Sequence, residues 1–225
     1  RMRCSRFRRL RRTISFSLRL ILFITIPATV ALIVLREPII SVLFQRGHFD
    51  AQSTALTAQA LLYYALGLWA FSTIRVIVSA FYALQDTKLP MRAAAAALVV
   101  NVAASLILMF PLRHGGLALA TSIATAANVA ILTVVLRRRI GPFFGGDFLP
   151  SLGKTAAASA IMAGCIGIAW RLFPWNVEAA AGERLAALAV YIGSGGVAFA
   201  AAATLVRCTE MMDILRMLRA RMARR

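Results

Sequence analysis

An arginine inside a long apolar stretch is the first candidate for chemistry in this sequence. Arg75 precedes a polar turn by about ten residues, so at ~1.5 Å per helical residue it lies roughly 15 Å deep in a predicted span. That depth is close to the midplane of a hydrocarbon layer ~30 Å thick. An arginine at this level costs roughly 2.5–3.5 kcal/mol on insertion scales, and such residues usually face a bundle interior or a watery cavity. The sequence therefore favours a transport protein over a passive membrane anchor.

Three other polar side chains share a helical face with Arg75: Ser72, Ser79 and Tyr82. All eight acidic residues of the chain lie outside the predicted spans or at their ends, so none can pair with Arg75 at its depth. The partner of Arg75 must then be another helix, backbone carbonyls, water or an anionic ligand. We predict that this face lines a substrate-binding cavity. The alternative is that the serines only allow helices to pack closely.

The polar turn after this helix reads Gln85-Asp86-Thr87-Lys88-Leu89-Pro90. The side chains of Asp86 and Thr87 can form hydrogen bonds with nearby backbone groups, and Pro90 suits the start of a helix. We predict a sharp reversal of the chain at this turn.

Uncharged polar side chains occur in the two spans that follow. Asn101 and Ser105 lie one turn apart on a face of the first. The second contains Thr121, Ser122, Thr125 and Asn128. Such groups usually form hydrogen bonds between membrane helices, worth ~0.6 kcal/mol each. They could also supply oxygen ligands to a hard cation, although a site without a carboxylate would be weak.

The composition is that of an integral membrane protein. Of the 225 residues 60% are apolar, and the mean hydropathy is +0.78, which is far outside the range of soluble domains. The apolar runs are apolar on every face rather than at alternate positions, so they predict helices rather than barrel strands. We predict an all-α polytopic membrane protein with a six-helix bundle at residues 15–206. The six spans are Ser15–Leu35, a stretch within Gln52–Leu84, Met91–Phe110, Gly116–Leu136, Thr155–Leu172 and Leu185–Val206.

Topology explains the formal charge of +18 better than nucleic-acid binding does. If six helices alternate across the membrane, the basic residues 1–14, Lys88, Arg137–Arg139 and the tail 207–225 all fall on one side. The other side has few basic residues. This is the positive-inside pattern, so we expect both chain ends in the cytoplasm and no nucleic-acid partner. Residues 1–14 and the basic tail are expected to lie on the anionic membrane surface.

A short amphipathic piece, Ile39–Asp50, separates the first two spans. It is too short to cross the membrane, so we expect an interfacial helix that ends at Gly47. Asp50 or Ser53 is expected to cap the long helix that follows.

Patterns typical of catalysis or metal binding are absent from the sequence. Cys4, Cys165 and Cys208 lack the spacing of a metal or redox site, and His48 has no ligand partner within reach along the chain. Nucleophile elbows, phosphate loops and paired carboxylates are not found. We therefore expect no enzymatic activity, no cofactor and no metal. The chain lacks an initial methionine and runs straight into a full-length span, so we expect it to be the C-terminal part of a longer protein.

Three motifs in a fixed order resemble one family of membrane proteins. They are Leu43–Phe49, Ala80–Pro90 and Pro111–Ser122. Together they are similar to the MurJ/MviN family, the bacterial lipid II flippases of the multidrug/oligosaccharidyl-lipid/polysaccharide exporter superfamily. The resemblance is close over residues 40–125 and loose over 140–225. That family has fourteen helices in two lobes, and the six spans here resemble helices nine to fourteen.

The resemblance implies a transporter that moves undecaprenyl-pyrophosphate-linked peptidoglycan precursor from the inner to the outer leaflet of the cytoplasmic membrane by alternating access. In such proteins cavity arginines hold the pyrophosphate, and Arg75 matches a basic position of the tenth helix. A groove beside the last two helices would take the lipid tail. Most cavity arginines belong to helices absent here, so the N-terminal lobe, the lipid-linked precursor and the bilayer are the implied partners. The family pattern of a cation site matches Asn101 and Thr121, whereas Ser105 replaces an acid or amide.

Two alternatives remain open at the level of sequence. The chain could belong to another exporter of the same superfamily, for polysaccharide lipids or drugs, although the Gln85-to-Pro90 motif argues against this. It could also be a non-transporting six-helix scaffold, in which case Arg75 is paired structurally.

Overall fold

The computed structural model describes residues 2–45, 50–176 and 179–212. These residues form seven helices and contain no strand. All helices but the short α2 are long and apolar enough to cross a membrane. The predicted all-α fold with six spans is thus confirmed. The helices are α1 (Met2–Val34), α2 (Arg36–Phe44), α3 (Ala51–Ala83), α4 (Lys88–Leu112), α5 (His114–Ile140), α6 (Phe148–Leu172) and α7 (Ala181–Leu205).

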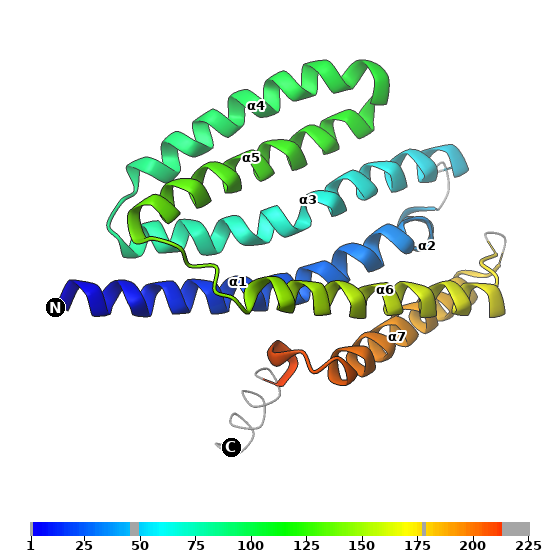
Figure 1. The fold of residues 1–225 in the computed structure, drawn as a ribbon. Coiled ribbons are helices and arrows are strands. Elements are labelled where there is room, and N and C mark those ends of the chain that lie inside the picture. Colours follow the sequence, from blue (N-terminus) through cyan, green and yellow to red (C-terminus); the bar gives the residue numbers. More distant parts are fainter. Residues whose placement is uncertain (1, 46–49, 177–178, 213–225) are drawn as a thin grey trace, which may run out of the picture.

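The six long helices form one row in space. Each packs mainly against its neighbours in the order α4, α5, α3, α1, α6, α7, so that α4 and α7 lie at opposite sides of the molecule (Figure 1). The helices of residues 15–206, for which a six-helix bundle was predicted, are thus arranged as an open row. Large apolar side chains such as Phe110 and Leu205, each 82% exposed, remain uncovered. A membrane helix tolerates this because lipid chains solvate apolar side chains as well as another helix does.

The centre of the row is held by apolar packing among three helices. Leu18 of α1, Phe81 of α3, and Leu132 and Leu136 of α5 are fully or almost fully buried in one cluster. A second cluster, which includes Met162 and Ile166 of α6 and Tyr191 of α7, joins the other side of the row to α1.

Small residues let α3 and α5 approach closely within this core. A Cβ atom added to Gly67 would overlap the Ser122 hydroxyl. That hydroxyl donates a hydrogen bond to the Tyr63 carbonyl at 2.8 Å. Ser122 therefore acts in packing between helices, as uncharged polar groups in spans usually do.

The basic start of the chain and the first span form a single helix. Figure 1 shows α1 as an unbroken ribbon, and no glycine or proline occurs between residue 2 and Pro27. Pro27 itself lies buried inside α1 without ending it. Residues 2–14 thus continue the axis of the first span, whereas a separate surface segment was predicted for 1–14. The reason is that nothing in the local sequence favours a helix end there.

The connection between the first two spans follows the prediction in part. The short helix α2 begins at Arg36, earlier than expected, while Gly47 and His48 lie outside the described residues. Asp50 caps α3 by accepting a hydrogen bond from the Ser53 backbone N–H at 2.8 Å. Most of the predicted basic tail, residues 213–225, also lies outside the described residues.

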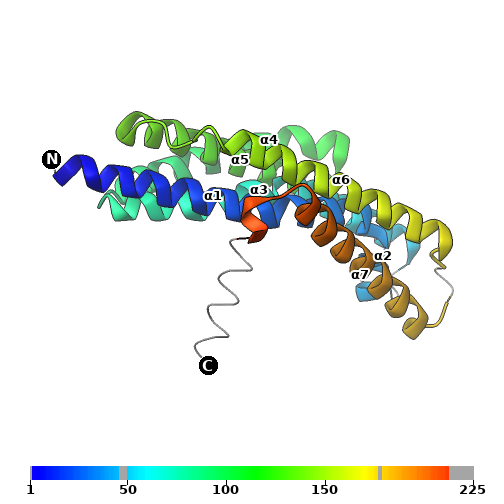
Figure 2. The same ribbon diagram turned by 60° about the horizontal axis from the view of Figure 1, so that its bottom comes forward.

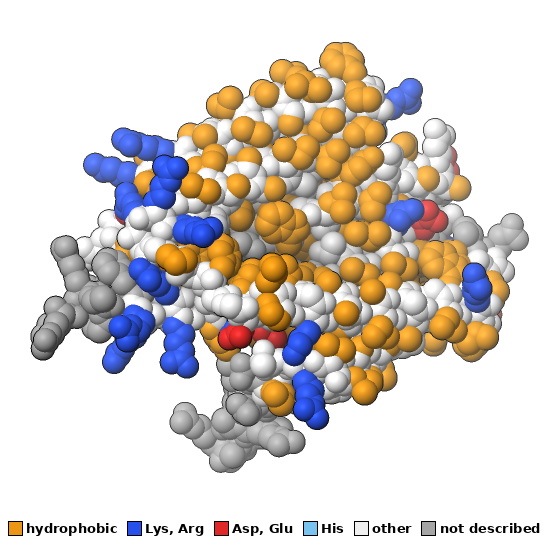
Figure 3. Space-filling view, viewed as in Figure 1, with side chains coloured by type: hydrophobic (Ala, Val, Ile, Leu, Met, Phe, Trp, Pro, Cys, Tyr) orange, Lys and Arg blue, Asp and Glu red, His pale blue; other side chains and the backbone are white. Residues whose placement is uncertain are grey.

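Charge and apolar surface are separated along the molecule. In Figure 3 most Lys and Arg side chains gather at the end where α1 starts, and hydrophobic side chains cover the middle of the helices. In Figure 2, α2 and the start of α7 lie together at the opposite end. There Arg184 Nη1 donates a hydrogen bond to Ser41 Oγ at 3.4 Å.

Candidate functional site

The predicted polar stripe forms one face of α3. Arg75 and Ser79 are exposed, Tyr82 is 57% exposed and Ser72 is half-buried. The buried side of α3 packs against α1 and α5 instead. The structure therefore brings the four residues onto one face, and that face points away from the core of the row.

Arg75 has no partner in the described part of the chain. None of the ion pairs among these residues includes it, and Ser79 donates its hydroxyl hydrogen bond to the Val76 carbonyl at 2.8 Å. Arg75 lies eight residues before the end of α3, which is ~12 Å along the helix axis. A guanidinium at such a position avoids the cost of lipid contact only if water, protein or an anion covers it.

The turn after α3 is fixed by backbone hydrogen bonds. The Gln85 N–H donates to the Tyr82 carbonyl at 2.9 Å, and the Asp86 N–H donates to the Phe81 carbonyl at 3.0 Å. Gln85 adopts a left-handed conformation with φ of 58°. These features define a Schellman motif, which stops a helix and reverses the chain. The sharp reversal predicted from the sequence is present.

Asp86 is the central side chain of this turn. Its Oδ1 accepts a hydrogen bond from the Leu89 N–H at 3.1 Å, and its Oδ2 accepts one from Arg139 Nη1 at 2.5 Å. The Leu89 N–H and, secondarily, the Arg139 guanidinium lower the pKa of the Asp86 carboxyl. Thr87, the other side chain predicted to form hydrogen bonds in this turn, makes none that caps α4. The Asp86 carboxylate already accepts the hydrogen bond of the Leu89 N–H, which is the donor that a Thr87 cap would need.

The rest of the turn begins α4 as expected. Lys88 is the first residue of α4 and is exposed, and Pro90 is buried in its first turn. A proline is tolerated there because the first backbone N–H groups of a helix have no intrahelical acceptor.

The residues of the predicted cation site are only partly assembled. Ser105 Oγ donates a hydrogen bond to Asn101 Oδ1 at 3.3 Å, and both line a cavity of about 250 Å³ between α4 and α5. Thr121 does not line this cavity, and its hydroxyl donates to the Leu117 carbonyl at 2.9 Å. No carboxylate lines the cavity. The described residues also contain no group of three His, Cys, Asp or Glu that could hold a metal ion.

Two ion pairs of the structure were not predicted from the sequence. Arg139, which the sequence presents as one of three consecutive arginines, pairs with Asp86 across 53 positions. Glu210, only 3% exposed, accepts a hydrogen bond from Ser151 Oγ at 2.7 Å and lies 3.7 Å from Arg19 Nε. In the sequence, the only indication of the Arg19–Glu210 pair is that Glu210 is an acidic residue within a basic tail.

Comparisons with known proteins agree with this architecture. The family model described as "Lipid II flippase MurJ" matches residues 7–183. A "Probable lipid II flippase MurJ" of Rhizobium tropici is 40% identical over 150 residues, which cover 67% of this chain and 28% of the relative. The protein of the same description in Rhizobium meliloti (strain 1021) is 36% identical over 191 residues, which cover 78% of this chain and 35% of the relative.

A solved structure has the same arrangement of helices. "Lipid II flippase MurJ, inward closed conformation" matches with a TM-score of 0.69 at 25% identity, over 93% of this chain and 43% of that chain. This chain spans about a third of the length of the Rhizobium meliloti relative. Because the family model covers most of the sequence, the chain belongs to the lipid II flippase MurJ family.

Proposed function

We propose that this chain is part of a transporter that moves lipid II, the undecaprenyl-pyrophosphate-linked peptidoglycan precursor, from the inner to the outer leaflet of the bacterial cytoplasmic membrane by alternating access. Family membership and the six spans support this proposal. The distribution of basic residues supports a topology with both ends in the cytoplasm. The N-terminal lobe of the same protein is the partner that completes the cavity.

The observation that carries the proposal is the exposed polar face of α3. Arg75 lies there without an acidic partner in the described chain, and the exposed Tyr82 lies on the same face. A pyrophosphate is the kind of ligand that such a face suits, because charged hydrogen bonds from arginine to phosphate are short and strong in a medium of low dielectric constant. In this proposal Arg75 contacts the pyrophosphate, and Ser72, Ser79 and Tyr82 line the same wall.

The cation site of Asn101, Ser105 and Thr121 remains a weaker proposal. Asn101 and Ser105 share a cavity, which supports it. However, the two side chains bond to each other, and a site of neutral oxygens binds a hard cation weakly.

Replacement of Arg75 tests the proposed function. The experiment compares Arg75→Ala, Arg75→Lys and the control Arg171→Ala, an exposed arginine at the end of α6, in the full-length protein reconstituted in vesicles. We expect Arg75→Ala to slow lipid II translocation about tenfold or more, because a charged hydrogen bond contributes about 1.5–3 kcal/mol. Arg75→Lys should retain part of the activity, and Arg171→Ala should retain all of it.

The amount of folded protein separates the alternatives. Normal translocation per folded molecule in Arg75→Ala, together with a lower folding yield, would favour the scaffold. Wild-type vesicles that move another lipid-linked saccharide but not lipid II would favour a different exporter of the superfamily.

A further inference from the structure

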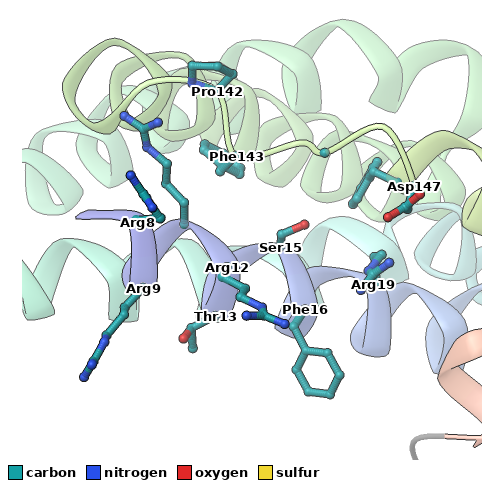
Figure 4. A pocket seen from close by; sticks show the side chains of 13 residues that line it. Arg8, Arg9, Arg12, Thr13, Ser15, Phe16, Arg19, Pro142, Phe143 and Asp147 are labelled. Atoms are coloured by element: carbon teal, nitrogen blue, oxygen red, sulfur yellow. The ribbon is translucent and has the colours of Figure 1, made fainter. Parts of the chain in front are cut away.

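A basic cavity of about 900 Å³ lies between the first half of α1 and the connection from α5 to α6 (Figure 4). In Figure 4, Ser15 and Arg19 lie on the side of α1 that faces Phe143 and Asp147. One carboxylate, that of Asp147, lines the cavity together with five guanidinium groups. The arginines are Arg8, Arg9, Arg11, Arg12 and Arg19.

The positive charge of this cavity is not balanced within the described chain. Arg19 has an anionic neighbour in Glu210, but the other four arginines form no ion pair with a described residue. Arg11 and Arg12 lie three and four positions after Arg8, a spacing at which like charges on a helix repel.

One of these arginines also carries an unused hydrogen-bond donor. The Nε atom of Arg11 is buried and makes no hydrogen bond to any described group, whereas the Nε atom of Arg19 lies 3.7 Å from Glu210 Oε1. A phosphate would supply both the negative charge and the acceptor oxygens that the cavity lacks.

An apolar cavity of about 610 Å³ adjoins the basic one. The two share Phe148 as a lining residue. The apolar cavity is lined by side chains of α1, α3, α5 and α6, including Leu22, Ile26 and Trp69. From Arg12 to Ile26 the wall of α1 thus changes from basic to apolar over ~21 Å. A lipid with a phosphate headgroup and an acyl chain matches this change, whereas a free phosphate matches only the basic half.

We propose that the two cavities form one binding site for an anionic membrane phospholipid. The phosphate lies among Arg8, Arg12 and Arg19, and an acyl chain enters the apolar cavity beside Phe148. The lipid neutralises the repulsion within α1 and joins α1 to the connection between α5 and α6. This role is distinct from the transport of substrate at the α3 face, because the basic cavity contains no residue of that face.

Lipid titration of matched variants tests the site. Full-length protein in neutral detergent is titrated with phosphatidylglycerol or phosphatidylcholine, and the bound lipid is counted by native mass spectrometry. The test variant carries Arg8→Gln and Arg12→Gln, both at exposed cavity positions. The control carries Arg137→Gln and Arg138→Gln, two exposed arginines of α5 outside the cavity, so that both variants lose the same charge.

We expect the test variant to bind phosphatidylglycerol about 30-fold more weakly, because each arginine near a membrane surface contributes about 1 kcal/mol towards an anionic lipid. The control should bind it as the wild type does, and phosphatidylcholine should bind weakly to all three proteins. Equal losses in both variants, or equal binding of the two lipids by the wild type, would overturn the proposal. Thermal unfolding of each variant verifies that the proteins compared are folded.

A second pair of variants distinguishes a lipid from a soluble phosphate. Ala130→Phe fills the apolar cavity, and Ala200→Phe adds the same ring at an exposed position of α7 outside it. We expect only Ala130→Phe to weaken phosphatidylglycerol binding, and sodium pyrophosphate to compete poorly. Unchanged binding in Ala130→Phe with effective competition by pyrophosphate would show a site for free phosphate and refute the lipid.

Discussion

Arg139 Nη1 lies 2.5 Å from Asp86 Oδ2, and this contact joins the end of α5 to the turn between α3 and α4. The other oxygen of the same carboxylate caps α4 through the Leu89 N–H. Asp86 therefore connects three helices with one side chain. The motif turn that relates this chain to its family acts as a structural joint, and its conformation depends on a residue far along the chain.

The joint can be tested with a double-mutant cycle. Asp86→Asn keeps a side chain that can cap α4 but removes the ion pair, and Arg139→Gln removes the same pair from the other side. We expect each change to lower the thermal unfolding temperature by a few degrees, and the double variant to lose little more than the more damaging single change. Arg138→Gln, which removes a neighbouring exposed arginine, should have almost no effect. Strictly additive losses would show that the two side chains do not stabilise each other.

The lowered pKa of the Asp86 carboxyl predicts that the protein loses stability in acid. Its pKa is lowered in the folded state, so Asp86 stabilises the fold fully above its unfolded pKa of about 4 and loses this contribution as the pH falls through the folded value. The Ser53 N–H lowers the pKa of Asp50 in the same way. The thermal unfolding temperature should therefore be constant from neutral pH to about pH 5 and fall below about pH 4. In Asp86→Asn the fall should be shallower, and an equal fall would contradict this assignment.

Glu210 is expected to hold the segment after α7 against α1 and α6. It is buried, accepts a hydrogen bond from Ser151 and lies beside Arg19. Glu210→Gln keeps the shape but removes the charge, so we expect a loss of about 2 kcal/mol in the free energy of unfolding. Glu183→Gln, at an exposed position of α7, is the matched control. Chemical unfolding measures the free energy of unfolding of the two variants. Equal values would mean that the buried charge of Glu210 does not stabilise the protein.

Gly116 is predicted to be intolerant of any side chain. A Cβ atom at this position would overlap the Leu108 carbonyl of α4, which is backbone and cannot rotate away. Gly116→Ala should therefore force α4 and α5 apart and destabilise the protein by about 1–3 kcal/mol. A Cβ at Gly145 meets no atom within 4 Å, so Gly145→Ala should be neutral. Equal unfolding temperatures for the two variants would exclude the predicted clash.

Local features were predictable because they depend on neighbouring residues. The six spans follow from length and hydropathy, and the structure has a helix at each of them. The Asp50 cap depends on a donor three positions away, and the reversal at Gln85 depends on backbone hydrogen bonds between residues three and five positions apart. The extent of α1 was missed, since its basic and apolar halves differ in composition but contain no residue that ends a helix between them.

Contacts between distant residues required the tertiary structure. The order of helices in the row, the Asp86–Arg139 pair and the Arg19–Glu210 pair bring together residues that no local pattern relates. The basic cavity is a similar case, because the arginines of α1 were evident but the opposite wall of Pro142, Phe143 and Phe148 was not. Hydropathy determines which segments enter a membrane, and it does so from the sequence alone. Hydropathy does not determine which helices pack together, because lipid and protein are equally apolar. Close packing and hydrogen bonds between helix surfaces determine this, and they are visible only in the tertiary structure.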